Sequence, residues 1–324
     1  MKTDNHTKDR EDIKKVQEEL KSPFSKLSHT WPILKKTAKA WMAQDPSRQS
    51  AVIAYYAIIS LPALLVIIVA ITGKIWGKEA VTGKLSGQFS NVMGTDAAKQ
   101  IEEMIKNAAI SDKTVIATIL AVVILLMGAT GVFVQLQKSL NMIWEVKPSP
   151  GKAFLKLLKV RILSFGLVLT LGFLLLVSLV ITTVISFFGV WLTSRLPEVA
   201  VVLLQIINFI ITFGFVTVLF ALMFKFLPDA KIQWKDVWIG AIVTAILFSL
   251  GKEALGIFFG KFPPATAFGA AGSIVLIMLW LSYSSMILFF GAEFTRQYAT
   301  WGGREVPPID EATKDPYGRI KINK

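Results

Sequence analysis

The chain has 324 residues, of which 53% are hydrophobic and 18% are charged, and its formal net charge is +13. Its mean hydropathy of +0.57 is too high for an ordinary soluble protein, so the composition predicts an all-α polytopic membrane protein. The lack of cysteine excludes disulfides, thiol catalysis and cysteine-ligated metals. In a membrane protein, the positive charge favours cytoplasmic loops that lie against anionic lipid.

The amino-terminal region divides into two parts. Residues 1–30 are polar and contain no apolar signal peptide, so they predict a partly disordered cytoplasmic tail. Residues 31–43 predict an amphipathic helix in the cytoplasmic membrane interface, with tryptophan at headgroup depth. A helix packed on the protein's own loops is the alternative. The residues expected to share the apolar face are Leu34, Ala38, Trp41 and Met42.

Six apolar runs follow, and each is long enough to cross a membrane as a helix. A helix rises about 1.5 Å per residue, so about 20 residues cross about 30 Å of hydrocarbon. The first run should also serve as the targeting signal. The polar stretch 73–113 predicts an outer loop with a short helix of its own. The six runs are 51–72, 114–136, 162–188, 199–224, 237–259 and 268–292.

The charges of the connecting loops predict how these spans are oriented. The loop from Lys138 to Arg161 has six basic residues against one acid, and the loop 225–236 has three lysines. The two short loops on the other side hold one basic residue each. Because basic loops stay in the cytoplasm, both termini should be cytoplasmic, and residues 31–298 should form one membrane domain. Residues 299–324 are polar and predict a disordered tail.

Two adjacent charges interrupt the fifth run. Lys252 and Glu253 should lie about 12 Å below the outer end of this helix, where each charge costs about 3 kcal/mol. Adjacent helical residues point about 100° apart, so each charge is expected to need another partner. Asn208 and Gln205 of the fourth run lie at matching depth, and these four residues predict a polar cavity for transport. In the structural alternative, Lys252 snorkels to the headgroups and Glu253 is buried by a neighbour or protonated.

Other residues of the spans are candidates for gating or packing. Pro62 frees a backbone carbonyl in the first span, beside two tyrosines that also fit an aromatic belt. The small residues of 128–131 and 268–273 favour close helix packing. The hydroxyls around Tyr283 are weak evidence for a permeation path, because they can bond their own backbone. The gating or packing candidates are Tyr55, Tyr56, Pro62, Gly269, Gly272, Tyr283 and Glu293.

The sequence has few of the residues that enzymes use. Histidine occurs only at His6 and His29, in the amino-terminal tail, and no Walker A, dinucleotide-binding or metal-binding histidine motif is present. We therefore expect no catalytic residue, no metal and no cofactor. The expected partners are membrane lipids, with anionic headgroups at the cytoplasmic face, and not nucleic acid. A homo-oligomer is left open.

Three stretches of the chain resemble one family: "AYYAIISLPALL", "LQKSLNMIW" and "FGAAGSIVLIMLWLSYSSMILFFGAEFTRQY". They are similar to the YihY/BrkB family of bacterial inner-membrane proteins, historically labelled ribonuclease BN, over residues 31–301. The resemblance implies six spans, cytoplasmic termini and a multi-pass protein of the inner membrane. Many members have a tyrosine before "GAAGS", where this chain has Phe268. The ribonuclease label implies a metal-dependent His/Asp cluster that this chain cannot supply, so we interpret it as a misassignment.

Composition, charge and resemblance together predict a transporter or permease-like protein of the cell envelope. Its substrate is either an anionic lipid, which Lys252 would contact, or a small cation or proton, which Glu253 would exchange. The alternative function is a non-transporting membrane scaffold for envelope assembly.

Overall fold

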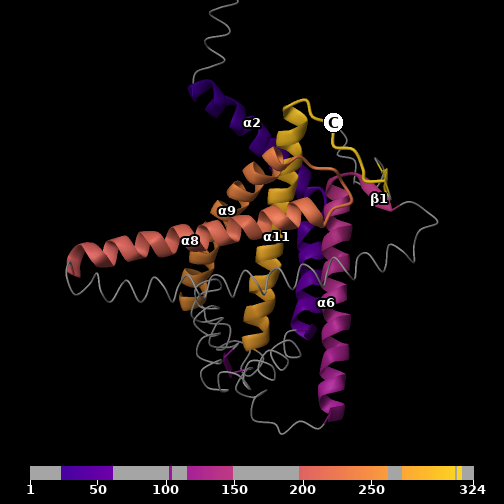
Figure 1. The fold of residues 1–324 in the computed structure, drawn as a ribbon, viewed down its shortest axis with the longest axis vertical. Helices are drawn as coiled ribbons and strands as arrows, with labels where there is room; N and C mark the ends of the chain where they lie inside the picture. Colours follow the sequence, from indigo (N-terminus) through magenta and orange to yellow (C-terminus); the bar gives the residue numbers. More distant parts are fainter. Residues whose placement is uncertain are drawn as a thin grey trace, which may run out of the picture.

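The computed structural model is mostly helical in the residues that it describes, which are 23–60, 102–103, 115–148, 197–261, 272–310 and 312–315 (Figure 1). The predicted all-α class is therefore confirmed. The helices are α2 (Pro23–Met42), α6 (Val115–Ile143), α8 (Pro197–Phe226), α9 (Trp234–Lys261) and α11 (Gly272–Trp301). The two short strands are β1 (Val146–Pro148) and β2 (Ala312–Lys314).

Three of the described helices are long and apolar enough to cross a membrane. They contain the candidate spans Val202–Phe226, Trp234–Phe259 and Ile274–Trp301, which correspond to the fourth, fifth and sixth predicted runs. α6 contains the second predicted run and continues to Ile143. Helical residues 46–60 contain the start of the first run. The third run and most of the predicted outer loop lie outside the described residues.

α11 is the central helix of the described part. It contacts α9, α2 and α6, and α8 contacts α9. In Figure 1, α6 and α11 run in the same lengthwise direction, whereas α8 runs across them. The two halves of α8 differ, because its amino-terminal half exposes apolar side chains and its carboxy-terminal half enters the core.

A ladder of aromatic rings connects α8, α9 and α11. Phe220 stacks on Phe224 within α8 and meets the ring of Phe248 of α9 edge-on at 5.7 Å. Phe248 in turn meets Trp280 of α11 edge-on at 5.9 Å. Because lipid is as apolar as these rings, the ladder stabilises the helix contacts through close packing and not through removal from water.

The corner between α2 and the following helix is sharp. Asp45 has a φ of 52°, a left-handed conformation that interrupts the helical path, and Pro46 then begins helical residues 46–60. The Asp45 carbonyl accepts a hydrogen bond from the backbone N–H of Gln49 at 3.3 Å. The Asp45 carboxylate accepts another from Arg48 at 3.0 Å. These contacts fix the corner that carries Gln44.

The end of α6 holds the loop that joins α8 to α9. Asn141 of α6 donates to the carboxylate of Asp229 at 2.8 Å, and its Oδ1 accepts the backbone N–H of Asp229 at 2.7 Å. Gln137, one turn earlier, donates to the same carboxylate at 3.2 Å. Asp229 is buried, so these hydrogen bonds compensate for its lost contact with water.

The predicted disorder of residues 299–324 is wrong for the first part of that range. α11 continues to Trp301, and β2 pairs antiparallel with β1, with Val146 opposite Lys314. The backbone also bonds to the α8–α9 loop, where Lys231 N–H donates to the Pro307 carbonyl at 2.8 Å. Backbone hydrogen bonds thus fix a polar segment that has little apolar surface to bury.

Arg304 attaches the start of this tail to α9. Its Nε and Nη2 donate to the two carboxylate oxygens of Asp236 at 3.1 and 2.5 Å. Asp236 is fully buried in the first turn of α9, where the helix dipole favours a negative charge. The hydrogen bond to Asp236 raises the pKa of Arg304 above its usual value.

Candidate functional site

Glu293 of α11 is a carboxylate inside an apolar helix, and its exposed fraction is 0%. It lies within the candidate span Ile274–Trp301, about 12 Å from the Trp301 end at a rise of 1.5 Å per residue. Ionisable side chains at such depth are costly, so they face the interior of a bundle and commonly mark ion or substrate paths. Glu293 is therefore the first candidate for a functional charge.

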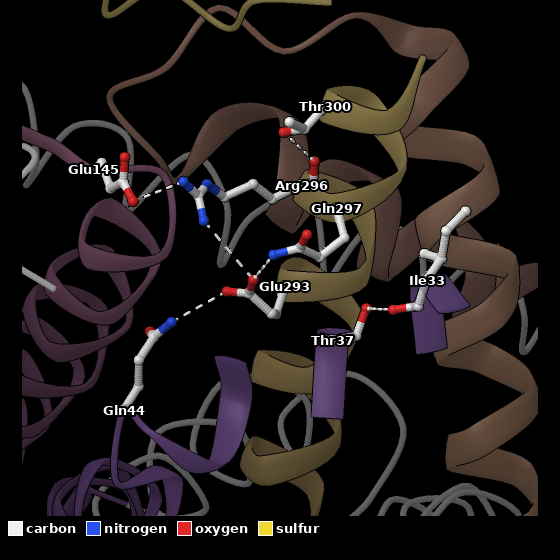
Figure 2. A network of polar contacts seen from close by, with 8 residues as sticks. All are labelled: Ile33, Thr37, Gln44, Glu145, Glu293, Arg296, Gln297 and Thr300. Carbon is white, nitrogen blue, oxygen red and sulfur yellow. Dashed lines mark hydrogen bonds and ion pairs between the residues drawn. The ribbon is translucent and has the colours of Figure 1, made fainter. Parts of the chain in front are cut away.

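Two amide side chains hold this carboxylate (Figure 2). Gln44, from the corner after α2, donates through Nε2 to Oε2 of Glu293 at 3.1 Å. Gln297, one turn further along α11, donates through Nε2 to Oε1 at 2.7 Å. Each carboxylate oxygen thus accepts a hydrogen bond, and the α2 corner is linked directly to α11.

Arg296 lies between two carboxylates, as Figure 2 shows. Its Nη2 is 2.6 Å from Oε1 of Glu145, whereas its Nη1 is 3.8 Å from Oε1 of Glu293. Glu145 lies two residues beyond the end of α6, and its backbone carbonyl accepts a hydrogen bond from the N–H of Asp315 at 2.7 Å. Arg296 therefore pairs more closely with Glu145 than with Glu293, and the network joins α11, α6 and the carboxy-terminal tail.

A cavity lies beside Glu293. It has about 10 Å³ of room for the centre of a water molecule, which suffices for one water. Within the described part, two buried atoms of its lining residues have no hydrogen-bond partner, Nε1 of Trp41 and Oε1 of Gln49. A cavity with such atoms favours a bound polar species. The lining residues are Trp41, Gln44, Pro46, Gln49, Ile143, Phe289 and Glu293.

The site offers a poor set of ligands for a resident metal. In the described ranges, no three acidic or histidine side chains gather closely enough to hold a metal ion. The two carboxylates of the network, Glu145 and Glu293, are bridged by the guanidinium of Arg296. Each of these two carboxylates thus has a positive charge beside it.

The crossing of α9 and α11 fixes the position of Glu293. A Cβ on Gly291 would overlap the side chain of Thr244, and a Cβ on Gly240 would overlap that of Thr295. Each threonine hydroxyl donates to the carbonyl of the glycine four residues earlier in its own helix, at 2.6 and 2.7 Å. The glycines let the two backbones approach closely. Residues two apart point to nearly opposite sides of a helix, so Glu293 faces away from α9.

Lys252 and Glu253 are brought together by the structure. Their Nζ and Oε1 atoms are 3.3 Å apart, so each is at least one partner of the other. The Glu253 side chain is 73% exposed, and that of Lys252 is 27% exposed. Asn208 is exposed on α8 and is not brought to the pair, and the side chain of Gln205 lies outside those described. The long, flexible lysine side chain bends back along the helix to make the contact.

The remaining gating or packing candidates lie at helix contacts or outside the described part. Gly131 of α6 packs against the ring of Tyr56, and Tyr55 is exposed. Gly251 of α9 packs against the ring of Tyr283. Gly272 is buried at the start of α11, whereas Pro62 and Gly269 lie outside the described residues. The contacts that the structure describes are typical of packing.

The predicted helix at 31–43 is present as part of α2, which begins earlier, at Pro23. Its buried face consists of Ile33, Thr37 and Ala40, and Trp41 meets Phe290 of α11 edge-on at 5.8 Å. The face predicted to be apolar is different, because Met42 is 68% exposed. α2 therefore packs on the protein with one face and leaves another face open.

The sequence named only one member of the Glu293 network. Gln44, Gln297, Arg296 and Glu145 were not predicted, since each lies near a predicted helix end, where polar residues are ordinary. One signal was available: Glu293, Arg296 and Gln297 are spaced three and four apart and share one helical face.

Comparison with known proteins agrees with this architecture. The family model for virulence factor BrkB matches residues 37–313. The chain belongs to the virulence factor BrkB family. A UPF0761 membrane protein of Aeromonas salmonicida is 25% identical over 279 residues, which cover 84% of this chain and 90% of that protein.

Other relatives in this family match over shorter stretches. A UPF0761 membrane protein of Tolumonas auensis is 24% identical over 61% of each chain. One of Verminephrobacter eiseniae is 27% identical over 53% of this chain and 39% of its own length. The chain thus covers less than two thirds of these two relatives. No solved structure matches it.

Proposed function

We propose that this protein is a six-span transporter of the bacterial inner membrane that exchanges a proton or small cation at Glu293. The observation that carries the proposal is the fully buried carboxylate of Glu293 inside a candidate span, beside a water-sized cavity. An ionisable group in that position is, by default, functional, because a purely structural role would be served by an apolar side chain at lower cost.

The geometry around Glu293 supports exchange. A carboxylate held by two neutral amides keeps its position whether or not a proton or cation is bound, because the amides do not titrate. Arg296 lies closer to Glu145, so Glu145 balances its charge when Glu293 is neutralised. The same arginine holds the ends of α6 and α11 together, and a transport cycle would break or re-form that contact.

Flux through the purified protein tests this function. Liposomes that contain the wild type, Glu293→Gln or Glu253→Gln would carry a pH or sodium gradient, and its decay would be followed with an internal dye. We expect flux in the wild type and in Glu253→Gln, and at least a tenfold loss in Glu293→Gln. The control substitution makes the same chemical change at an exposed carboxylate.

Each other result has a definite meaning. An equal loss of flux in Glu293→Gln and Glu253→Gln would mean that the loss does not depend on the buried position, which would contradict the role of Glu293. Flux that survives in Glu293→Gln would show a path that bypasses this residue. No flux in any sample, with fluorescent lipid moved across the same vesicles, would favour the anionic-lipid substrate. Silence in both assays would favour the membrane scaffold.

A further inference from the structure

The exposed face of α2 is a separate feature from the Glu293 site. Trp31, Lys35, Lys39 and Met42 follow one another at spacings of four, four and three residues, so they form one stripe along the helix. Trp31 is 72% exposed, and Lys36 is exposed at the edge of the stripe. We call these five residues the α2 stripe. A large apolar side chain stands at each end of it and the three lysines lie between them, a combination typical of helices that lie at a membrane surface.

The charge of the α2 stripe is not balanced by the protein. None of its three lysines makes an ion pair within the part of the chain that the structure describes. The sequence of α2 contains no acidic residue at all. A solvated helix face normally mixes both signs of charge, so a one-sign stripe with exposed tryptophan and methionine points to an anionic partner that is also apolar.

The position of α2 in the fold places the stripe near the membrane surface. α9 and α11 pack antiparallel, because Gly240 lies against Thr295 and Gly251 lies against Tyr283. The start of α9 and the end of α11 therefore lie at the same end of the molecule. Exposed tryptophans mark that end: Trp234, Trp238 and Trp301. Tryptophans at the ends of spanning helices sit at headgroup level. In Figure 1, α2 meets α11 near the carboxy-terminal end of α11.

We propose that the α2 stripe binds the phosphate headgroups of anionic phospholipids in the cytoplasmic leaflet, with Trp31 and Met42 inserted between them. The partner is a lipid, because the lysines lie between two large apolar side chains that a lipid surface would cover and an acidic soluble protein would leave partly exposed. Each lysine near such a surface contributes about a fivefold preference for anionic lipid. The inference does not depend on transport at Glu293.

The chain offers a clean test, because it has no cysteine. A single cysteine at Ala38, a partly exposed residue next to Lys39 at the edge of the stripe, would carry a fluorophore on the full-length protein. The protein would be placed in nanodiscs of phosphatidylcholine with one quarter phosphatidylglycerol, with either lipid brominated in turn. We expect the brominated phosphatidylglycerol to quench several-fold more than an equal amount of brominated phosphatidylcholine.

Substitutions then assign this preference to the lysines. The triple change Lys35→Gln, Lys36→Gln and Lys39→Gln should abolish this several-fold preference, so that both lipids quench equally, and the triple change to arginine should retain it. Lys261→Gln, at the far end of α9, is the control and should change nothing. Equal quenching by both lipids in the unsubstituted stripe would overturn the proposal. So would a fluorophore that neither lipid quenches, because the stripe would then face water or another protein.

Discussion

The two ends of the α9–α11 pair differ sharply in how they treat charge. At one end, Gly240 and Gly291 bring the helices into close contact, and Glu293 is buried on the far side of α11 from α9. At the other end, Lys252 and Glu253 pair with each other on the surface of α9. The first end encloses a charge among residues of three helices, whereas the second leaves its charges near the edge of the protein.

This difference shows that the environment of a charged residue depends on its burial in the folded protein and not on how apolar its neighbours in the sequence are. Lys252 and Glu253 stand out in the sequence because apolar residues surround them. Glu293 stands in a stretch with Arg296 and Gln297 and draws less attention. In the folded protein, Glu293 is the more unusual of these charges. The regions at the ends of α2 and α6 cover it, whereas no described helix covers Glu253. If burial decides, substitutions at the two ends should differ in their effect on stability as the ends differ in structure.

The largest expected effect is the loss of the buried carboxylate. Glu293→Ala leaves the amides of Gln44 and Gln297 without their acceptor and enlarges the cavity, so we expect it to destabilise the protein by about 3–5 kcal/mol. Glu253→Ala should change stability by less than about 0.5 kcal/mol, because the side chain is mostly exposed. Denaturation in mixed micelles, followed by tryptophan fluorescence, measures both. Similar losses for the two variants would remove the contrast.

The next effect concerns the glycines of α9. Gly240→Ala places a Cβ against Thr295 and should destabilise by about 1–3 kcal/mol through overpacking. Gly256→Ala, in the same helix, meets nothing within 4 Å and should stabilise by up to about 1 kcal/mol. Thr295→Ala in the Gly240→Ala background should restore part of the loss. If Gly240→Ala proves neutral, the helices do not cross as closely as this contact implies.

The helices were predictable from sequence to within a few residues at most ends, because long apolar runs leave few alternatives. The runs 237–259 and 268–292 became α9 and α11, but α11 extends to Trp301. The extension was missed because hydropathy falls at Glu293, while helical hydrogen bonding continues through polar residues. The family resemblance was equally visible, in stretches such as "GAEFTRQ".

The site was less predictable, because it depends on tertiary contacts between distant segments. Gln44 and Glu293 are 249 positions apart, and no local pattern indicates that they meet. The tail was missed for a similar reason. Its sequence is polar, and it is fixed by contacts with β1, with the α8–α9 loop and with Asp236, all of which lie elsewhere in the chain.

A smaller effect is expected where the tail joins α9, at the same end as Glu293. Arg304→Lys cannot make both hydrogen bonds to Asp236 and should weaken tail attachment by about 1 kcal/mol. Hydrogen exchange of residues 305–315 should then become several-fold faster. Lys314→Gln, whose salt bridge with Glu305 is exposed, is the control and should leave exchange nearly unchanged.

The pH dependence of this attachment follows from the raised pKa of Arg304. A raised pKa means that the stabilisation is fully present below the ordinary arginine pKa and is lost only as pH rises through the higher folded value. Protection of the tail should therefore stay constant between about pH 7 and 10 in the wild type. In Arg304→Lys it should begin to fall near pH 10, since lysine titrates there. A fall in the wild type over that range would contradict the assignment.

The smallest effect should come from removing both surface charges at the other end. Lys252→Leu with Glu253→Leu removes both charges of the 3.3 Å pair together, and we expect a change within about 0.5 kcal/mol. Glu253→Leu alone should cost more than the double change, because it removes the carboxylate that lies 3.3 Å from the Lys252 ammonium and keeps the positive charge. The same denaturation assay compares the three proteins. A double change as costly as Glu293→Ala would show that Lys252 and Glu253 hold a third group and would restore them as a site.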